Sequence, residues 1–261
     1  MRISLRIALA ASATMLMLGA AQAQDLNLKI GTEGAYPPFN NLTADGKLEG
    51  FDIDIANALC EEMKAKCEFV TQDWDGIIPA LQAGKFDAII ASMSITDERK
   101  QKVDFTQKYY NTPSAIAAPK DTTLTGVTKA DLAGKTIGVA TSTTHSNYAT
   151  QTYTDSEVKG YPSSQEFLLD LANGRLDAVE DDISVLEEWL KTADGACCKI
   201  VGQPSPQPVE IFGEGAGIAV RKGETALVEK FNAAIKAIRA NGKYKAINDK
   251  YFPFDVYGAE S

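Results

Sequence analysis

Residues 88–99 read AIIASMSITDER, and this stretch decides the expected architecture. The apolar run at its start predicts a short buried strand, which opens into small and hydroxyl residues before Arg99. A strand end that presents hydroxyls, backbone N–H groups and a guanidinium suits a carboxylate, because arginine binds such a group through two parallel hydrogen bonds. The competing interpretation is a helix that begins at Thr96 and carries a surface arginine. On this stretch alone the two interpretations have equal support.

The composition is that of an ordinary globular protein, with 44% hydrophobic and 23% charged residues. A chain of 261 residues is long enough for one large domain or two smaller lobes. Its 26 basic and 35 acidic residues give a net charge of −9. That balance argues against a nucleic-acid partner and is compatible with a cationic ligand.

Residues 1–23 have the pattern of a signal peptide. Arg2 and Arg6 precede a mostly apolar run over 7–19, and Ala21-Gln-Ala23 fits a small-x-small cleavage site. Cleavage after Ala23 predicts an exported, soluble protein, because no later stretch approaches 18 apolar residues.

The four cysteines allow three disulfide pairings, and export permits disulfides. A bridge between Cys60 and Cys67 would clamp the end of a predicted helix to the following strand. Cys197 and Cys198 are either a vicinal disulfide or two thiols. A metal site is not expected, because the spacing fits no zinc motif and the chain has 1 histidine.

Polar and aromatic side chains follow three predicted strands in turn. The carboxyl ends of such strands meet at one edge of an open α/β sheet, where ligands bind, so we expect these side chains to gather there. Loop packing is the alternative for Tyr36. The residues are Glu33 and Tyr36 after strand 26–30, Trp74 after strand 67–71, and Ser92, Ser94 and Arg99 after strand 88–90.

The segments between these strands predict a hairpin over 41–51 and a helix that Asp52 caps. A short helix over 77–83 follows. The second half repeats the α/β pattern, which predicts two lobes joined by two strands near 112 and 210. The further elements expected are strands at 114–118, 132–139, 157–161, 175–182, 199–201 and 212–221, and helices at 163–172, 183–191, 226–241 and 244–251.

Two strand ends of the second half are also candidate sites. Thr141-Ser-Thr-Thr-His145 starts a helix, and helix N-termini bind anions; the alternative is a cap cluster that binds nothing. The strand 175–182 ends in three acids, which could hold an ammonium group. The alternative is that Asp181 or Asp182 caps the next helix.

Several catalytic signatures are absent from the sequence. No strand is followed by GxGxxG or GxxxxGK[ST], and GxSxG does not occur. His145 is the one candidate base for a serine triad and has no evident acid partner. Paired carboxylates for acid–base chemistry stay open with Glu33 and Asp182.

At this point the chain resembles a known family, the periplasmic solute-binding proteins of ABC importers (family 3), and within it the lysine/arginine/ornithine- and histidine-binding group. The resemblance covers nearly all of the mature chain. The motifs that carry it are GFDID at 50–54, WDGIIP at 74–79, SMSITDER at 92–99, GRLDA at 174–178, GEG at 213–215 and YFPFDVYG at 251–258.

The resemblance implies a type II periplasmic binding protein fold, an α/β fold with two lobes. Each lobe would be a sheet flanked by helices, and two hinge strands would join them. Residues 24–111 plus 215–261 would form the first lobe and 112–214 the second, with hinge segments at 111–114 and 207–215.

The resemblance also implies the ligand contacts. Arg99, Ser92 and backbone near Ser94 and Thr144 would hold an α-carboxylate, and Asp182, with Ser94 assisting, the α-ammonium. Tyr36 and Trp74 would sandwich an aliphatic chain whose cationic end pairs with Glu33. Ala91, Thr143 and His145 complete the expected site, and the Cys60–Cys67 disulfide fits the same group.

Four site residues depart from the family pattern. Glu33 replaces the usual aspartate and reaches further, and Trp74 replaces a smaller residue and offers a better cation–π face. Ala91 removes a hydroxyl, and His145 stands where a glutamine is common. Cys197–Cys198 has no counterpart in the family.

We therefore expect a monomeric periplasmic protein that captures a basic L-amino acid and delivers it to a membrane permease. We expect the highest affinity for arginine, a lower one for ornithine or lysine, and the lowest for histidine. No cofactor, metal or catalytic activity is expected. The alternatives are an enzyme like the periplasmic cyclohexadienyl dehydratases, a binder of an arginine-derived opine and, with less support, a sensory domain.

Overall fold

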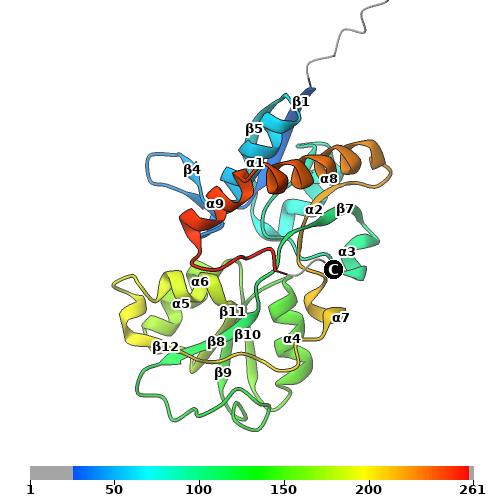
Figure 1. Cartoon of the computed structure of the whole chain (residues 1–261). Coiled ribbons are helices and arrows are strands. Elements are labelled where there is room, and N and C mark those ends of the chain that lie inside the picture. Colours follow the sequence, from blue (N-terminus) through cyan, green and yellow to red (C-terminus); the bar gives the residue numbers. More distant parts are fainter. Residues whose placement is uncertain (1–25, 259–261) are drawn as a thin grey trace, which may run out of the picture.

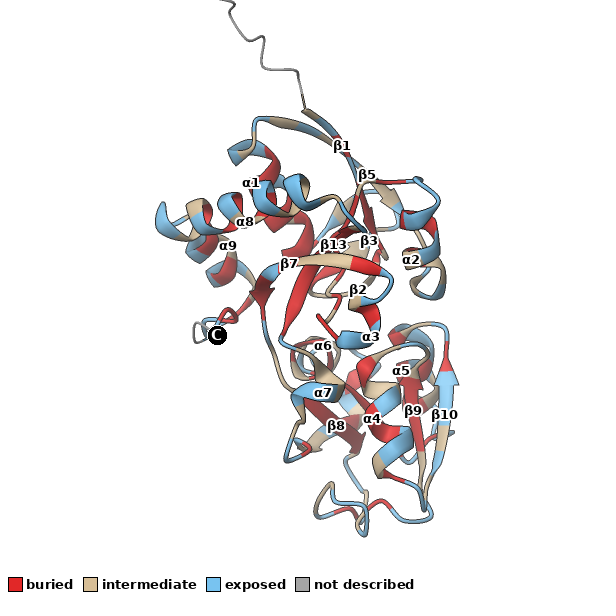
Figure 2. Ribbon diagram, turned by 90° about the vertical axis from the view of Figure 1, so that its right-hand side faces the viewer, coloured by how far each residue is buried: buried red, intermediate tan, exposed pale blue. Residues whose placement is uncertain are grey.

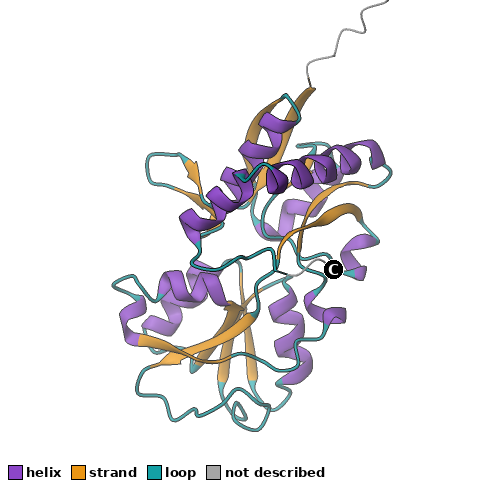
Figure 3. Cartoon of the chain, viewed as in Figure 1, coloured by secondary structure: helices purple, strands orange, loops and turns teal. Residues whose placement is uncertain are grey.

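The computed structural model describes residues 26–258, so the expected signal peptide at 1–23 lies outside the described residues. The described chain forms two lobes, one above the other in Figure 1. Figure 3 shows that each lobe is a sheet with helices packed against it. This is the two-lobed α/β fold expected from the sequence.

The first lobe is built on a five-stranded sheet with the order β5-β1-β6-β13-β7. β1, β5 and β6 run parallel, and β13 runs antiparallel to both β6 and β7. Its strands are β1 (Leu26–Thr32), β5 (Ala65–Thr71), β6 (Ala88–Ile89), β7 (Val103–Tyr110) and β13 (Ala216–Arg221). A hairpin sheet adds β2 (Ala35–Tyr36), β3 (Asn40–Leu42) and β4 (Leu48–Glu49).

Helices cover both faces of this sheet. On one face α1 (Phe51–Glu62), α8 (Thr225–Ala240) and α9 (Lys243–Tyr251) bury a core around Phe51 and Phe231. On the other face α2 (Trp74–Gln82) packs Ile77 and Leu81 against the sheet. Figure 2 colours the buried residues red, and they include much of the sheet and parts of α1, α8 and α9. The helix over 226–241 was therefore expected almost to the residue.

The start of α1 differs from the expectation that Asp52 caps it. Gly50 precedes the helix with φ 124°, and a Cβ there would lie 2.3 Å from the Phe39 carbonyl oxygen. Only glycine fits this close approach, so the helix begins at Phe51 and Asp52 lies in its first turn. The Asp52 side chain is thereby free to reach other groups.

The second lobe is built on a sheet with the order β10-β9-β11-β8-β12. β9, β10 and β11 run parallel, whereas β8 is antiparallel to both of its neighbours. Its strands are β8 (Ser114–Pro119), β9 (Thr136–Ala140), β10 (Glu157–Tyr161), β11 (Ala178–Asp182) and β12 (Cys198–Gly202).

Alternate residues of β8 supply the two cores of this lobe. Ala115 and Ala117 face α5 (Ser164–Ala172) and α6 (Ile183–Trp189), whereas Ile116 and Ala118 face α4 (Thr144–Thr152). This period of two is what a strand covered on both faces requires.

The chain crosses between the lobes twice. The first crossing runs from the end of β7 to the start of β8, at residues 111–113. The second crossing, at 203–215, contains the short helix α7 (Val209–Phe212) where a strand was expected near 210, and β13 begins at 216 rather than 212. Gly213 and Gly215 explain the later start of β13, because their φ values of 82° and 113° lie outside the region that strands adopt.

Two disulfides are formed. Cys60 in α1 is bonded to Cys67 in β5, which ties the helix end to the next strand as expected. Cys197 and Cys198 are bonded to each other, which resolves the open alternative of bond or thiols. Within 26–258 no helix is long and apolar enough to cross a membrane.

Glu180 on β11 makes stability depend on pH. Its side chain is fully buried; Oε1 accepts from the Ser114 hydroxyl at 2.9 Å, whereas Oε2 has no partner among the described residues. Burial raises the pKa of Glu180 to about 8 from 4.5. Between pH 4.5 and about 8 the folded protein holds a proton that the unfolded chain has lost, so the free energy of unfolding falls as pH rises.

We predict that Glu180→Gln flattens this fall. The wild-type free energy of unfolding should decrease from pH 5 to pH 8, and the variant should lose less over the same range. Urea titrations at several pH values measure it, with the exposed Glu187→Gln as the control. Parallel curves for wild type and Glu180→Gln would contradict a buried, proton-binding Glu180.

Candidate functional site

A cavity between the two lobes holds most of the residues singled out from the sequence. Nine of the eleven expected site residues line it. From the first lobe these are Glu33, Tyr36, Trp74, Ala91, Ser92, Ser94 and Arg99, and from the second Thr143 and Thr144. The three lining residues that the site prediction left out are Ala140, Ser164 and Asp181.

Arg99 is a buried cation held by backbone oxygens. It lies in the short helix α3 (Asp97–Lys100), which Thr96 caps as the capping signature indicated. Its guanidinium donates to the carbonyls of Ser94 at 3.0 Å and Ser142 at 3.1 Å. No carboxylate of the described residues forms a salt bridge with it, and burial lowers its pKa to about 10. This position therefore suits an anion.

The two serines that flank this position have unusual backbone geometry. Ser92 follows β6 with φ 56° and Ser142 follows β9 with φ 59°, both in the left-handed region. Non-glycine residues adopt it at a cost of about 1–3 kcal/mol, and such residues cluster at binding sites. In each lobe a parallel strand, β6 or β9, is thus followed by a turn with a strained serine.

Asp52 fixes the Ser92 turn. Its carboxylate accepts from the hydroxyl of Ser92 at 2.9 Å, that of Tyr109 at 2.7 Å and the amide of Asn40 at 2.8 Å. The Ser92 backbone N–H donates to the same tyrosine oxygen at 3.1 Å. Both donors of Ser92 are engaged in this arrangement. From the sequence, Asp52 was expected to cap a helix; its role at the Ser92 turn was not predicted, although the motif GFDID contains it.

Glu33 is an acid without a partner. It follows β1, and no hydrogen bond or salt bridge involves its carboxylate within the described part of the chain. Burial raises its pKa to about 7, and the negative charges of Asp181, Asp73 and Asp75 add to the rise. This carboxylate therefore suits a cation, and it lines the same cavity as Arg99.

The two aromatic residues contact protein groups as well as the cavity. The Trp74 ring lies 5.2 Å from Cζ of Arg99, and its Nε1 donates to the Ser142 carbonyl at 3.2 Å. Tyr36 stacks on Phe39 with ring centroids 5.8 Å apart. Part of the cation–π face expected of Trp74 is thus occupied by the protein's own arginine.

The start of α4 brings hydroxyls and backbone N–H groups from the second lobe. Thr143 caps the helix by accepting from the Ser146 N–H at 3.0 Å, and it donates to the Ala140 carbonyl at 2.7 Å. Thr144 is the first helical residue and is buried. The N–H groups at the start of α4 point out of the helix, and such groups suit an anion.

Asp182 and His145 do not line this cavity but the adjoining one, which shares Tyr36, Ser92, Ser94 and Thr144 with it. Asp182 caps α6: one oxygen accepts from the Ser184 N–H at 2.7 Å and the other from the Thr112 hydroxyl. Burial raises its pKa to about 7. The alternative that Asp182 caps the next helix is therefore confirmed, next to the cavity rather than in it.

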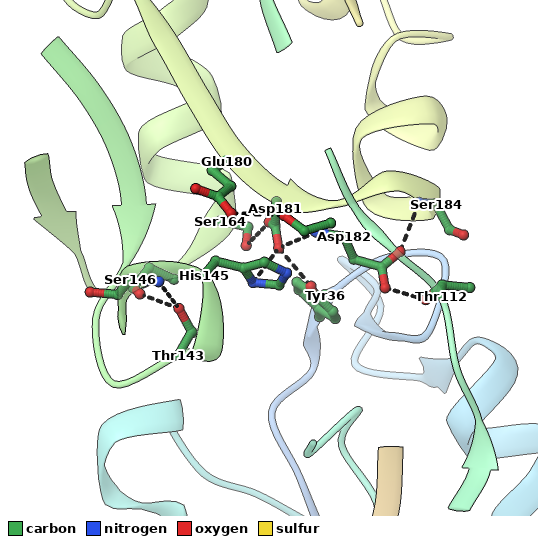
Figure 4. Close-up of polar contacts among 12 residues, drawn as sticks. Tyr36, Thr112, Thr143, His145, Ser146, Ser164, Glu180, Asp181, Asp182 and Ser184 are labelled. Carbon is green, nitrogen blue, oxygen red and sulfur yellow. Dashed lines mark hydrogen bonds and ion pairs between the residues drawn. The ribbon is translucent and has the colours of Figure 1, made fainter. Parts of the chain in front are cut away.

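Asp181 is the acid of β11 that lines the cavity. Figure 4 shows it between Tyr36, His145 and Ser164. It accepts from the hydroxyls of Tyr36 and Ser164, each at 2.6 Å. His145 Nδ1 lies 3.5 Å away, and burial lowers the pKa of this histidine. The run of three acids was the only signal in the sequence.

Contacts across the cavity hold the lobes together. Tyr36 bonds to Asp181, Trp74 and Arg99 both bond to the Ser142 carbonyl, and the Thr141 hydroxyl donates to Asp75 at 3.1 Å. The cavity is therefore enclosed by both lobes, as in a closed cleft.

Known proteins match this chain over most of its length. A family model described as bacterial extracellular solute-binding proteins, family 3, matches residues 28–254. The L-arginine-binding protein of Pseudomonas aeruginosa is 54% identical over 240 residues, 91% of this chain and 92% of that protein. ABC transporter arginine-binding protein 1 of Escherichia coli is 41% identical over 250 residues, 95% and 99% of the two chains.

A solved structure has the same fold. An ancestral arginine-binding protein bound to arginine superposes with a TM-score of 0.80 at 40% identity, and the match covers 87% of this chain and 98% of that one. The relatives are named as binding proteins, which supports the expectation that the chain is not an enzyme.

We predict that Asp52→Ala destabilises the protein by about 2–4 kcal/mol, because it leaves the buried partners of Asp52 unpaired. Urea unfolding measures this. Asp54→Ala is the matched control two residues along the same helix: it removes a partly exposed carboxylate that contacts Lys250 and the Tyr251 hydroxyl, and it should cost about 1 kcal/mol. Equal effects of the two variants would mean that the Asp52 network is not a structural support of the site.

Proposed function

The chain belongs to the bacterial extracellular solute-binding proteins of family 3, and from that premise we propose that it captures a basic L-amino acid for an ABC importer. Its affinity is highest for arginine, lower for ornithine and lysine, and lowest for histidine. Relatives named as arginine-binding proteins support arginine as the preferred ligand. The opine and enzyme alternatives have no supporting observation.

One observation carries the proposal. The cavity holds a buried guanidinium without a carboxylate partner and a carboxylate without a cationic partner, both judged within residues 26–258. A molecule with a carboxylate at one end and a cation at the other satisfies both. An acidic or apolar amino acid would leave Glu33 unpaired, and an unpaired buried charge is costly.

Each part of the ligand has a protein group for it. The α-carboxylate binds Arg99, the first N–H groups of α4 at Thr144, and Ser92 once its hydroxyl turns from Asp52. The α-ammonium lies where the two cavities meet and binds Asp182 with help from Ser94. The aliphatic chain passes between Tyr36 and Trp74, and the distal cation pairs with Glu33.

The lobes close around the ligand by a hinge motion. The moving bodies are 24–111 plus 215–261 and 112–214, with hinges at 111–114 and 207–215. The two crossings support this placement, because within 26–258 the chain passes between the two five-stranded sheets only at these segments. Ligand bridges the lobes and so favours the closed form, which the permease recognises.

The protein works as a monomer in the periplasm after its signal peptide is removed. Relatives named as periplasmic binding proteins of basic amino acids support the location. Its partners are the ligand and a membrane permease, and nucleic acid is not among them. The described residues contain no group of three or more acids, cysteines or histidines that could hold a metal.

We predict that arginine, ornithine and lysine raise the melting temperature of the mature protein. A ligand at 100 times its Kd adds about 2.7 kcal/mol to the free energy of unfolding. Glu33→Gln should weaken arginine binding by about 30-fold or more in calorimetry, because the ligand cation loses its charged partner. Glu49→Gln, on the exposed hairpin, should leave binding unchanged. Stabilisation by acidic or apolar amino acids alone would overturn the assignment of Glu33.

We further predict that arginine binding strengthens as pH rises toward about 8. Free Glu33 and Asp182 both have a raised pKa of about 7, so below pH 7 they hold protons that a bound cation expels. For each carboxyl that must lose its proton on binding, the affinity falls up to tenfold for every pH unit below its pKa. Calorimetry in buffers of different ionisation enthalpy counts the protons. A flat profile, identical in Glu33→Gln, would show that Glu33 is ionised before the ligand arrives.

A further inference from the structure

The proposed function leaves one carboxylate of the cavity unused. Asp181 lines the cavity with Glu33 and comes from the opposite lobe. We propose that Asp181 is a second specificity-determining carboxylate, which together with Glu33 makes the cavity prefer a guanidinium to an ammonium or to an uncharged group of the same shape. The inference rests on the proposed capture of a basic amino acid and names the residue that selects among such ligands.

The position of Asp181 is fixed. The residue is 2% exposed and lies near the end of β11. Oδ1 accepts from the Tyr36 hydroxyl at 2.6 Å and from the Asp182 N–H at 2.8 Å, and Oδ2 accepts from the Ser164 hydroxyl at 2.6 Å. Three donors from three segments hold the carboxylate in one orientation (Figure 4).

The carboxylate still has room for a ligand donor. A carboxylate oxygen has two lone pairs, and Oδ2 accepts one hydrogen bond among the described residues. His145 does not use this oxygen, because its Nδ1 approaches Oδ1 at 3.5 Å. One acceptor site of Asp181 is thus open on a residue that lines the cavity.

Asp181 and Glu33 influence each other. After burial, the charge of Asp181 is the largest cause of the raised pKa of Glu33, ahead of the charges of Asp73 and Asp75. Two carboxylates that face one enclosure repel until a cation enters. Other titratable groups near this pair are Glu180 and Asp182, which flank Asp181 on β11, and His145 beside it. Arg99 is the buried cation of the same cavity, and its guanidinium bonds to the carbonyls of Ser94 and Ser142.

The chemistry of the cation then decides among ligands. A guanidinium presents five donors in a fixed plane and can donate to two carboxylates at once, whereas an ammonium is a compact point charge with three donors. The ureido group of citrulline has nearly the shape of a guanidinium but no charge, and its oxygen would face a carboxylate. Asp181 should therefore separate arginine from citrulline most, and from lysine less.

Asp181→Asn tests the inference, because asparagine keeps the size and can still accept from Tyr36 and donate to Ser164. Calorimetry gives the Kd of arginine, lysine and citrulline for wild type and variant. The arginine-to-citrulline affinity ratio should fall at least tenfold, and the arginine-to-lysine ratio should fall as well. Glu180→Gln, the adjacent buried acid outside the cavity, should change neither ratio.

Tyr36→Phe separates selection from support. If Asp181 acted only by holding Tyr36 across the cleft, Asp181→Asn and Tyr36→Phe would both weaken all three ligands by the same factor. That result, or unchanged ratios with lower affinities, overturns the inference. Should the asparagine variant not fold, Asp181→Ala carries the same comparison of ratios.

The proposed function fails separately. A wild-type protein that binds no basic amino acid would refute the function and the inference together. A wild-type protein that binds arginine, with ratios that Asp181→Asn leaves unchanged, would refute only the role of Asp181.

Discussion

The uncompensated charge of Arg99 is the constraint on which the site depends. The residue is 9% exposed, and its guanidinium is held by two carbonyl oxygens rather than a carboxylate. Carbonyl dipoles offset only part of the lost hydration, which is why burial lowers its pKa. The fold therefore maintains a position that an anion stabilises. One of the two carbonyls, that of Ser142, comes from the other lobe, so this position is complete only when the lobes are together.

The acidic end of the cavity carries negative charge that a cation would stabilise, and it too is complete only when the lobes are closed. Glu33 belongs to the first lobe and Asp181 to the second, so closing the lobes brings two carboxylates into one enclosure. An empty closed cleft must tolerate their repulsion or take up a proton. A ligand shifts an equilibrium only by its difference in affinity for the two states. A zwitterion with a distal cation has that difference at both ends, because each end uses groups from both lobes only in the closed form.

Much of this arrangement could be predicted from the sequence because parallel strands deliver their carboxyl ends to one edge. Glu33, Trp74 and Arg99 were placed together on that argument alone, and they line one cavity. The start of α1 was not predictable from capping preference, because a close backbone approach at Gly50 overrides it. The later start of β13 was not evident from the run 212–221, because the positive φ of Gly213 and Gly215 delays the strand until 216.

The assignment of the acids on β11 was beyond the sequence for a physical reason. Successive residues of a strand point to opposite faces, so a shift of one residue exchanges which acid faces the cavity. Glu180, Asp181 and Asp182 offer the same carboxylate chemistry in any register, and no apolar residue among them reports the buried side. The structure fixes the register by pairing Asp181 with Ala115 and Asp182 with Ser114. Asp182 then caps α6 beside the adjoining cavity, and Asp181 faces the enclosure that Glu33 shares. Where a strand ends in several acids, the sequence therefore does not show which of them faces the cavity. A shift of the strand register by one residue would change which carboxylate contacts a bound cation.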